Sequence, residues 1–171
     1  MSTKSPFDPY ELLQALDRES VSYVVVGGFA RVVHGSGETT RGLDIVPSLR
    51  EENLRRLAGA LEALGATDKD GKPIPPDELA RDDRFVAKTR AGSLTVVPTP
   101  WGTRGYDDLR IRVYRENLGR GLRPPIVSVV DLARMLQASS RDEDHERLHR
   151  LRRMMELERQ LTRHRGLRIE R

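Results

Sequence analysis

Apolar residues recur along the chain with two different spacings, and these spacings predict its first helices and strands. The Asp-Pro pair at positions 8–9 suits a helix start, and leucines at 12, 13 and 16 continue at helical spacing to about residue 18. The aromatic and β-branched run Tyr23–Val26 predicts a buried strand, which Gly27 and Gly28 end. A short apolar helix to residue 33 and a second strand at 43–46 follow.

The middle and end of the chain predict two further helices and a hairpin. Ser48 with Glu51, and Ser128 with Asp131, have the spacing of capping boxes and predict helix starts. Strands at 84–89 and 93–97 flank an Arg-Ala-Gly turn, which predicts a hairpin. Residues 98–105 are a predicted loop that holds the single tryptophan, Trp101. We expect Trp101 to pack over the core, and the alternative is that it serves as a binding anchor. A short helix near 76–80, another at 106–112 and a long charged helix from residue 142 to about 163 complete the series.

This order of elements predicts an α/β (α+β) fold. We expect a small mixed sheet flanked by helices, with a C-terminal helical extension. The expected organisation is one domain over residues 1–140 and a charged C-terminal helix over residues 141–171.

The amino-acid composition indicates the cellular compartment of the protein and the kinds of partner it binds. Of 171 residues, 37% are hydrophobic and 33% are charged, which is typical of a soluble globular protein. No apolar run approaches the ~18 residues of a membrane span, and no signal pattern opens the chain, so we expect a bacterial cytoplasmic protein without a membrane partner. The absence of cysteine excludes disulfides and thiol chemistry. A net charge of +4 carried by arginine favours a nucleic-acid or nucleotide partner, although a solvated surface explains it equally well.

Gly27, Gly28 and Asp44 form the centre of the candidate functional site. A Gly-Gly turn between a strand and a helix exposes backbone N–H groups to which an anion can bind. Gly27, Gly28, Arg31 and Arg41 are therefore the predicted phosphate- or nucleotide-binding residues, and Arg84 and Arg90 are two further arginines that could bind a phosphate backbone. Asp44, on the neighbouring strand, is where a metal ion for that anion would be held.

The same residues carry a family resemblance. Gly27-Gly28-Phe29-Ala30, His34-Gly35 and Thr40-Arg41-Gly42-Leu43-Asp44-Ile45 resemble the signature of small bacterial nucleotidyltransferase-fold proteins. This minimal polymerase-β-like family includes the toxin of type IV toxin–antitoxin systems. Residues 90–98, 102–109 and 128–144 resemble its later hairpin strand, its Gly-Tyr segment and its closing helix.

The resemblance implies transfer of a nucleoside monophosphate, with Mg²⁺ ions held by three carboxylates. In this chain only Asp44 is present, because Gly42 and Thr95 stand at the other two acid positions. Leu136 stands where the family has a lysine, and Glu143 stands at a second basic position. We therefore expect a weak metal site at Asp44, no resident cofactor, and a pseudoenzyme that acts by binding nucleic acid, a nucleotide or a protein.

Three alternatives stay open. The protein could be an active toxin-type enzyme that uses Asp44 and Mg²⁺ to transfer a nucleotide to RNA or protein. Glu38, Asp82 or Asp131 would then supply the missing carboxylates. The long helix could serve self-association or partner binding, because so polar a helix is stable only when docked.

The remaining alternative is a zinc hydrolase. The run His145-Glu146-Arg147-Leu148-His149 matches the pattern H-E-x-x-H. His164 and Glu170 are the candidate third ligands, and the many neighbouring arginines argue against a bound cation.

Overall fold

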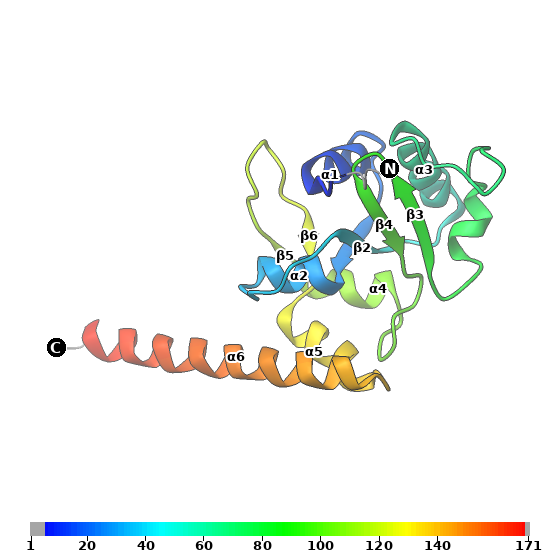
Figure 1. Cartoon of the computed structure of the whole chain (residues 1–171). Helices are drawn as coiled ribbons and strands as arrows, with labels where there is room; N and C mark the ends of the chain where they lie inside the picture. Colours follow the sequence, from blue (N-terminus) through cyan, green and yellow to red (C-terminus); the bar gives the residue numbers. More distant parts are fainter. Residues whose placement is uncertain (1–5, 170–171) are drawn as a thin grey trace.

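A mixed six-stranded sheet forms the centre of the protein (Figure 1). The computed structural model describes residues 6–169. The strands lie in the order β3-β4-β2-β1-β6-β5, with β2 antiparallel to β1 and parallel to β4, and β6 parallel to β1. The mixed sheet confirms the predicted fold class. The strands are β1 (Tyr23–Val26), β2 (Gly42–Pro47), β3 (Phe85–Thr89), β4 (Gly92–Val96), β5 (Tyr114–Arg115) and β6 (Pro125–Ile126).

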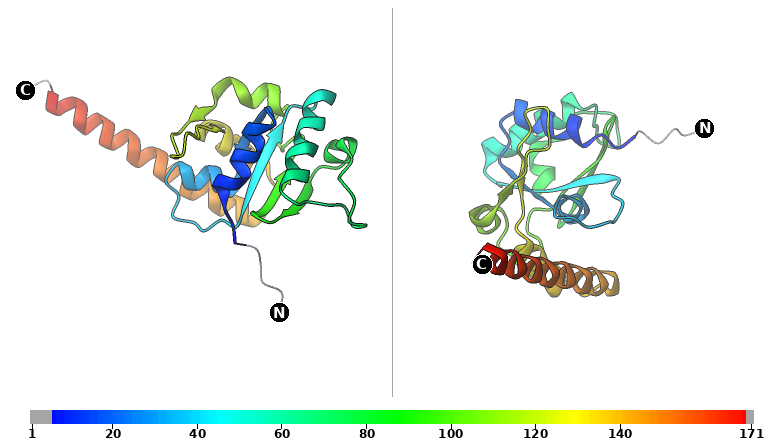
Figure 2. Two further views of the ribbon diagram at one scale, coloured as in Figure 1. Left: turned by 90° about the horizontal axis from the view of Figure 1, so that it is seen from above. Right: turned by 90° about the vertical axis from the view of Figure 1, so that its left-hand side faces the viewer.

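Helices flank this sheet. Helices α1 and α3 pack side by side over the sheet, while α5 and α6 pack on each other away from them (Figures 1 and 2). None of the helices within residues 6–169 combines the length and apolar character that a membrane crossing requires. The helices are α1 (Pro9–Arg18), α2 (Gly27–Val33), α3 (Glu51–Ala63), α4 (Tyr106–Leu109), α5 (Val129–Ala138) and α6 (Asp142–Ile169), with 3₁₀ turns η1 (Pro76–Ala80) and η2 (Arg110–Arg112).

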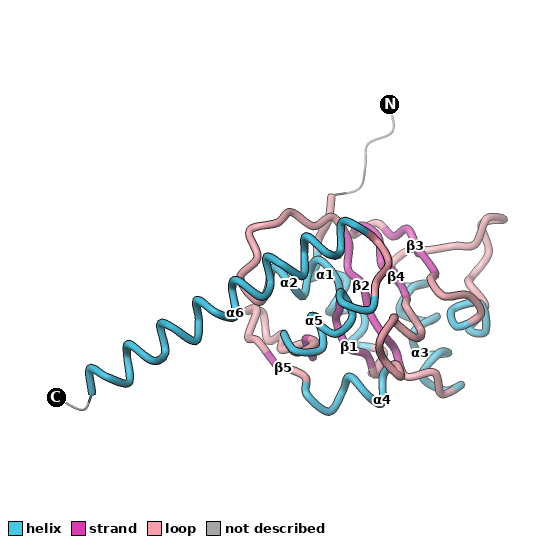
Figure 3. Tube along the Cα trace, turned by 90° about the horizontal axis from the view of Figure 1, so that it is seen from below, coloured by secondary structure: helices cyan, strands magenta, loops and turns pink. Residues whose placement is uncertain are grey.

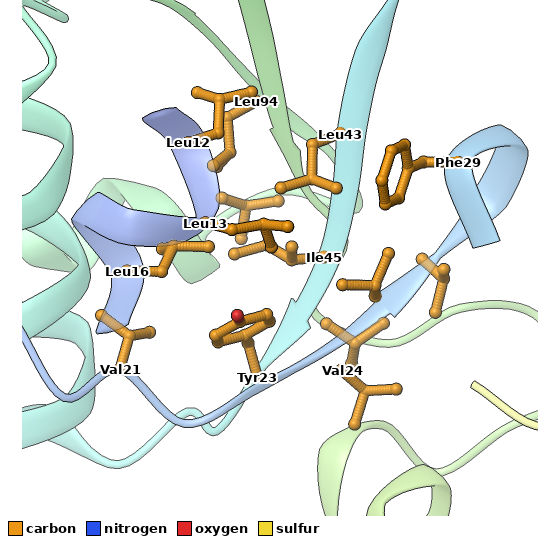
Figure 4. Close-up of a cluster of buried hydrophobic side chains, with 14 of the residues drawn as sticks. Leu12, Leu13, Leu16, Val21, Tyr23, Val24, Phe29, Leu43, Ile45 and Leu94 are labelled. Carbon is orange, nitrogen blue, oxygen red and sulfur yellow. The ribbon is translucent and has the colours of Figure 1, made fainter. Parts of the chain in front are cut away.

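The hydrophobic core lies between α1 and the sheet (Figure 4). Leu12, Leu13 and Leu16 of α1 are fully buried there. Leu43 and Ile45 of β2 are also fully buried, because alternate residues of a strand point to the same face. Asp44, between them, must therefore point to the opposite face of the sheet.

Two helix starts follow the predicted caps and one does not. Asp8 Oδ1 accepts hydrogen bonds from the N–H groups of residues 10 and 11, and Ser128 Oγ accepts one from Asp131 N at 3.1 Å. The capping box predicted at Ser48 is wrong, because α3 starts after Arg50 without a side-chain cap. Asn53 instead donates to the carbonyl oxygens of Ser48 and residue 22, which ties the end of β2 to the start of β1.

Helix α6 is the C-terminal extension, and it leaves the body of the protein as a single rod (Figure 3). Its first turns pack on α5, and Leu148 and Leu151 in this part of the helix are only 7% and 2% exposed. Farther along, Leu157 and Leu161 are 58% and 63% exposed. The expected domain boundary at residue 140 falls between α5 and α6, so the packed first turns of α6 adjoin the main domain.

Candidate functional site: a cleft around Asp44

A cavity lies where the carboxyl end of β1 meets α5 and the start of α6. Its volume is about 490 Å³. Gly27, Gly28 and Asp44 lie in its wall, as do the loop before β3, the loop after β4 and the first turns of α6. The polar and aromatic side chains that line it are Arg31, Asp44, Asp83, Arg84, Thr99, Trp101, Ser139, Arg141, Glu143, Asp144 and Arg147.

Gly27 and Asp44 pack so closely that position 27 admits only glycine. Gly27 has a φ of +70°, in the left-handed region that a side chain disfavours. A Cβ at this position would lie 2.3 Å from Asp44 Oδ2. The Asp44 carboxylate therefore lies against the turn that starts α2, as the sequence predicted. Helix α2 is only seven residues long, so the charges needed to hold an anion must come from side chains.

The position of Asp44 within the sheet raises its pKa. Asp44 lies opposite Val26 of β1 and opposite Thr95 of β4. Burial, which penalises the charged form, is the largest influence and raises the pKa of the Asp44 carboxyl above its usual range. Arg84, the Thr95 hydroxyl and Arg31 act in the opposite direction but do not outweigh burial. Asp44 is thus a carboxylate with too few cations around it.

None of the other four positions that the resemblance assigns to charged groups carries the expected charge. Thr95 is buried beside Asp44 on β4. Gly42 does not line the cleft, and a Cβ there would lie 3.0 Å from the carbonyl oxygen of Ser93. Leu136 and Glu143 do line it, as an apolar and an acidic group at expected basic positions.

The residues present do not fit a two-ion magnesium site. Such a site needs several carboxylates converging on one point, and residues 6–169 contain no cluster of three or more acids or histidines able to hold a metal ion. Glu38 and Asp131, two candidate replacements, are paired with arginines instead, Glu38 with Arg31 and Asp131 with Arg112. Asp82 lies outside the cleft wall, although its neighbour Asp83 lines it.

The arginines of the cleft differ in how firmly they are held. Arg31 donates from Nε and Nη2 to Glu38, with a shortest distance of 2.9 Å. Arg147 donates to Asp144 Oδ1 at 2.8 Å. Arg84 is exposed and has no hydrogen-bond or ion-pair partner within the described chain. Arg41 and Arg90, which were also predicted to bind phosphate, are exposed and do not line the cleft, and Arg90 pairs with Glu11.

Several cleft residues were not predicted, because they come from distant parts of the sequence. Asp83 lies in the loop before β3, and Arg141 and Arg147 lie around the start of α6. Asp144 joins them, buried and bonded to Ser139 Oγ and Arg147. Burial alone would raise the pKa of Asp144, but these two hydrogen bonds and the charges of Arg141 and Arg147 hold it below its usual range. The only sequence signal for these residues was the dense charge at the start of the last helix.

Two residues of the H-E-x-x-H pattern, His145 and Glu146, have structural partners. His145 Nε2 lies 3.2 Å from the carbonyl oxygen of Ser139, and Glu146 accepts a hydrogen bond from Arg150. His164 lies more than four helical turns farther along the same rod, and Glu170 falls outside the described residues. These contacts give zinc no preformed site.

The fold of this protein resembles the folds of several solved structures. No protein-family model matches the chain, and no curated protein matches it. Several solved structures resemble it over most of its length. The lincosamide antibiotic adenylyltransferase LnuA with bound lincomycin has a TM-score of 0.57 at 18% identity, covering 87% of this chain and 99% of its own. TM1012 of Thermotoga maritima, described as a candidate nucleotidyltransferase, has a TM-score of 0.51 at 14% identity and covers 90% of both chains.

The antibiotic-resistance factor ANT(2'')-Ia has a TM-score of 0.50 at 17% identity, covering 94% of this chain and 92% of its own. These identities are too low to transfer an activity, but the three neighbours share one architecture with the chain. The protein therefore has the nucleotidyltransferase fold.

Proposed function

We propose that this protein binds a nucleotide in the cleft around Asp44 without transferring its nucleoside monophosphate. The observation that carries the proposal is the make-up of the cleft. It joins the Gly27-Gly28 turn to four arginines and an aromatic ring, yet Asp44 is the one acid at the strand positions where a two-ion site needs several.

Arginine is suited to replace a metal ion as the counter-charge of phosphate. Its planar fork donates two parallel hydrogen bonds to phosphate oxygens and stays charged at any physiological pH. Arg84 is the arginine best placed to do so, because no acid in the described chain pairs with it and its charge already acts on Asp44. Arg141 is also weakly committed, with a long 3.6 Å contact to Asp144.

The structural neighbours favour a nucleotide over a nucleic acid as the ligand. LnuA is an adenylyltransferase observed with lincomycin, and ANT(2'')-Ia has been observed with adenylyl-2''-tobramycin. Both molecules are small. The cleft volume of about 490 Å³ also lies in the range of small-molecule sites, roughly 300–1,000 Å³. ATP is therefore the first probe to use.

The first prediction is that ATP binds equally well with Mg²⁺ and with EDTA, because arginine rather than metal holds the phosphates. Isothermal titration calorimetry measures the dissociation constant of ATP under both conditions. Arg84→Ala should weaken binding about tenfold, the expected loss of a charge-assisted hydrogen bond. Arg56→Ala is the matched control, because Arg56 is an exposed arginine on α3, away from the cleft.

Asp44→Asn separates binding from metal-dependent catalysis. With arginine-held phosphates, removing the carboxylate charge leaves ATP affinity equal or higher. In a metal-dependent enzyme the same change abolishes both the metal site and activity. Metal-dependent transfer of label from ATP to RNA or protein that disappears in Asp44→Ala would establish the alternative, an active toxin-type nucleotidyltransferase.

A further inference from the structure

Trp101 is the single tryptophan of the chain, and its side chain is 52% exposed in the wall of the cleft. The sequence predicted that it packs over the core, and this prediction is wrong. A large ring left half in water costs stability, since full burial of a large apolar side chain contributes about 1.5–3 kcal/mol. We therefore expect a ligand bound in the cavity to cover this exposed ring.

The loop that carries Trp101 is held by local hydrogen bonds and by packing against α5. Thr103 donates twice to the carbonyl oxygen of Pro100, from its N–H at 3.1 Å and from its hydroxyl at 2.9 Å. Gly102 has a φ of +77°, and a Cβ there would lie 2.8 Å from Ala138 Cβ of α5. The loop is thus closely packed on α5 just after the tryptophan. Binding of a ligand that stacks on this ring therefore has a small entropic cost for ordering the loop.

Arg141 lies over the same ring from the link between α5 and α6. Its guanidinium carbon is 5.9 Å from the centre of the Trp101 ring. A flat group between two stacked planes needs about 7 Å, because each layer takes roughly 3.5 Å. Arg141 would have to withdraw by about 1 Å, and its 3.6 Å contact to Asp144 is loose enough to permit that movement.

We propose that Trp101 and Arg141 form a stacking platform for the base of the bound nucleotide. The ligand is accordingly a nucleotide with an aromatic base rather than an inorganic polyphosphate or a sugar phosphate. This inference rests on the proposed function and adds to it the part of the ligand that lies away from the phosphates.

The experiment compares ATP with inorganic tripolyphosphate, which has the phosphates without the base. ATP should quench the tryptophan fluorescence excited at wavelengths that tyrosine does not absorb, and this signal reports on Trp101 because the chain has no other tryptophan. Trp101→Ala should weaken ATP binding in calorimetry about tenfold or more, the usual loss of base stacking. Tripolyphosphate affinity should not change, and Trp101→Phe should retain most of the ATP affinity. Leu161→Ala, at an exposed apolar position outside the cleft, is the control.

The outcomes distinguish the two proposals. If ATP binds no better than tripolyphosphate and Trp101→Ala changes neither constant, the stacking platform is wrong while phosphate binding stands. If wild-type protein binds neither compound, the proposed function fails and the platform fails with it. Because Trp101 is half exposed, its replacement should leave the thermal unfolding midpoint within about 2 °C of wild type, and Trp101→Phe provides a second variant with the ring retained.

Discussion

Burial raises the pKa of the Asp44 carboxyl, so the folded protein holds this proton more tightly than the unfolded chain does. An ionised Asp44 therefore reduces stability above its folded-state pKa, and this penalty disappears below the unfolded value near 3.8. The same residue is the only strand carboxylate in the cleft. A group that costs stability and lines a cavity is typical of a binding site.

Asp44→Asn should consequently stabilise the protein at pH 7. We expect a gain of about 0.5–2 kcal/mol in the free energy of unfolding, the range typical of a single stabilising substitution. The gain should vanish as the pH falls below 3.8, where both forms are uncharged. Urea unfolding over a pH series measures this difference. Asp83→Asn, which changes an exposed carboxylate of the same cleft, should show little effect.

A loss of stability in Asp44→Asn at every pH would contradict this account. Asp44 would then act as a structural acceptor for backbone N–H groups near Gly27. The close approach of the carboxylate to that turn makes the comparison informative.

Among the elements, the loop between α2 and β2 is held by one ion pair. Glu38 accepts three hydrogen bonds from the Arg31 guanidinium and one from Ser36. Burial alone would raise the pKa of Glu38, but the hydrogen bonds from Arg31 and Ser36 outweigh it and hold the pKa below its usual range. Arg31 lines the cleft, so this pair also fixes one wall of the site.

Glu38→Gln should destabilise the protein by about 1 kcal/mol at pH 7, a charged hydrogen-bond value reduced for partial exposure. Because the folded-state pKa is lowered, the contribution is complete above the unfolded value near 4.5 and is lost as the pH falls through the folded value. Thermal unfolding at pH 7 and at pH 3 measures the change. Glu52→Gln, in an exposed pair with Arg56, should cost only about 0.3–0.5 kcal/mol. If Glu38→Gln and Glu52→Gln lowered the free energy of unfolding equally, the Arg31–Glu38 pair would contribute no more to stability than an exposed ion pair.

At the scale of the whole molecule, α6 divides into a packed part and a projecting part. Leu148 and Leu151 are buried, whereas Leu157 and Leu161 are mostly exposed. Helices that stand alone in water are marginal in stability. Self-association through the projecting part stays a prediction.

Removing residues 157–171 should therefore leave the free energy of unfolding within about 0.5 kcal/mol of wild type, as expected for exposed positions. Removing residues 148–171 should cost several kcal/mol, since each buried leucine contributes about 1.5–3 kcal/mol. Urea unfolding compares the two deletions. Light scattering on the same samples measures the mass, and a dimer that becomes a monomer on the shorter deletion would locate the self-association in the projecting part. If the protein unfolded when only residues 157–171 were removed, the division of α6 into a packed part and a projecting part would be wrong.

Local patterns determined much of the fold before any tertiary contact was known. The hydrophobic alternation of β2 buried Leu43 and Ile45 and therefore turned Asp44 to the other face. The Gly27-Gly28 turn, the hairpin at β3 and β4 and the cap at Ser128 depend on neighbouring residues, and each was predicted. Gly27, Gly28, Arg31 and Asp44, all predicted from one short stretch, do lie together in the cleft.

Only the tertiary structure decided what surrounds these four residues. Arg41 falls outside the cleft, while Trp101, Arg141 and Arg147 enter it from loops and a helix far along the chain. The start of α3 also followed a tertiary contact, since Asn53 joins the ends of two strands in place of the predicted Ser48 cap. Sequence spacing fixes which face of an element a side chain occupies. The docking of elements remote in sequence fixes which charges and rings meet across a cavity, and here that docking placed an exposed tryptophan beside a carboxylate with too few counter-charges.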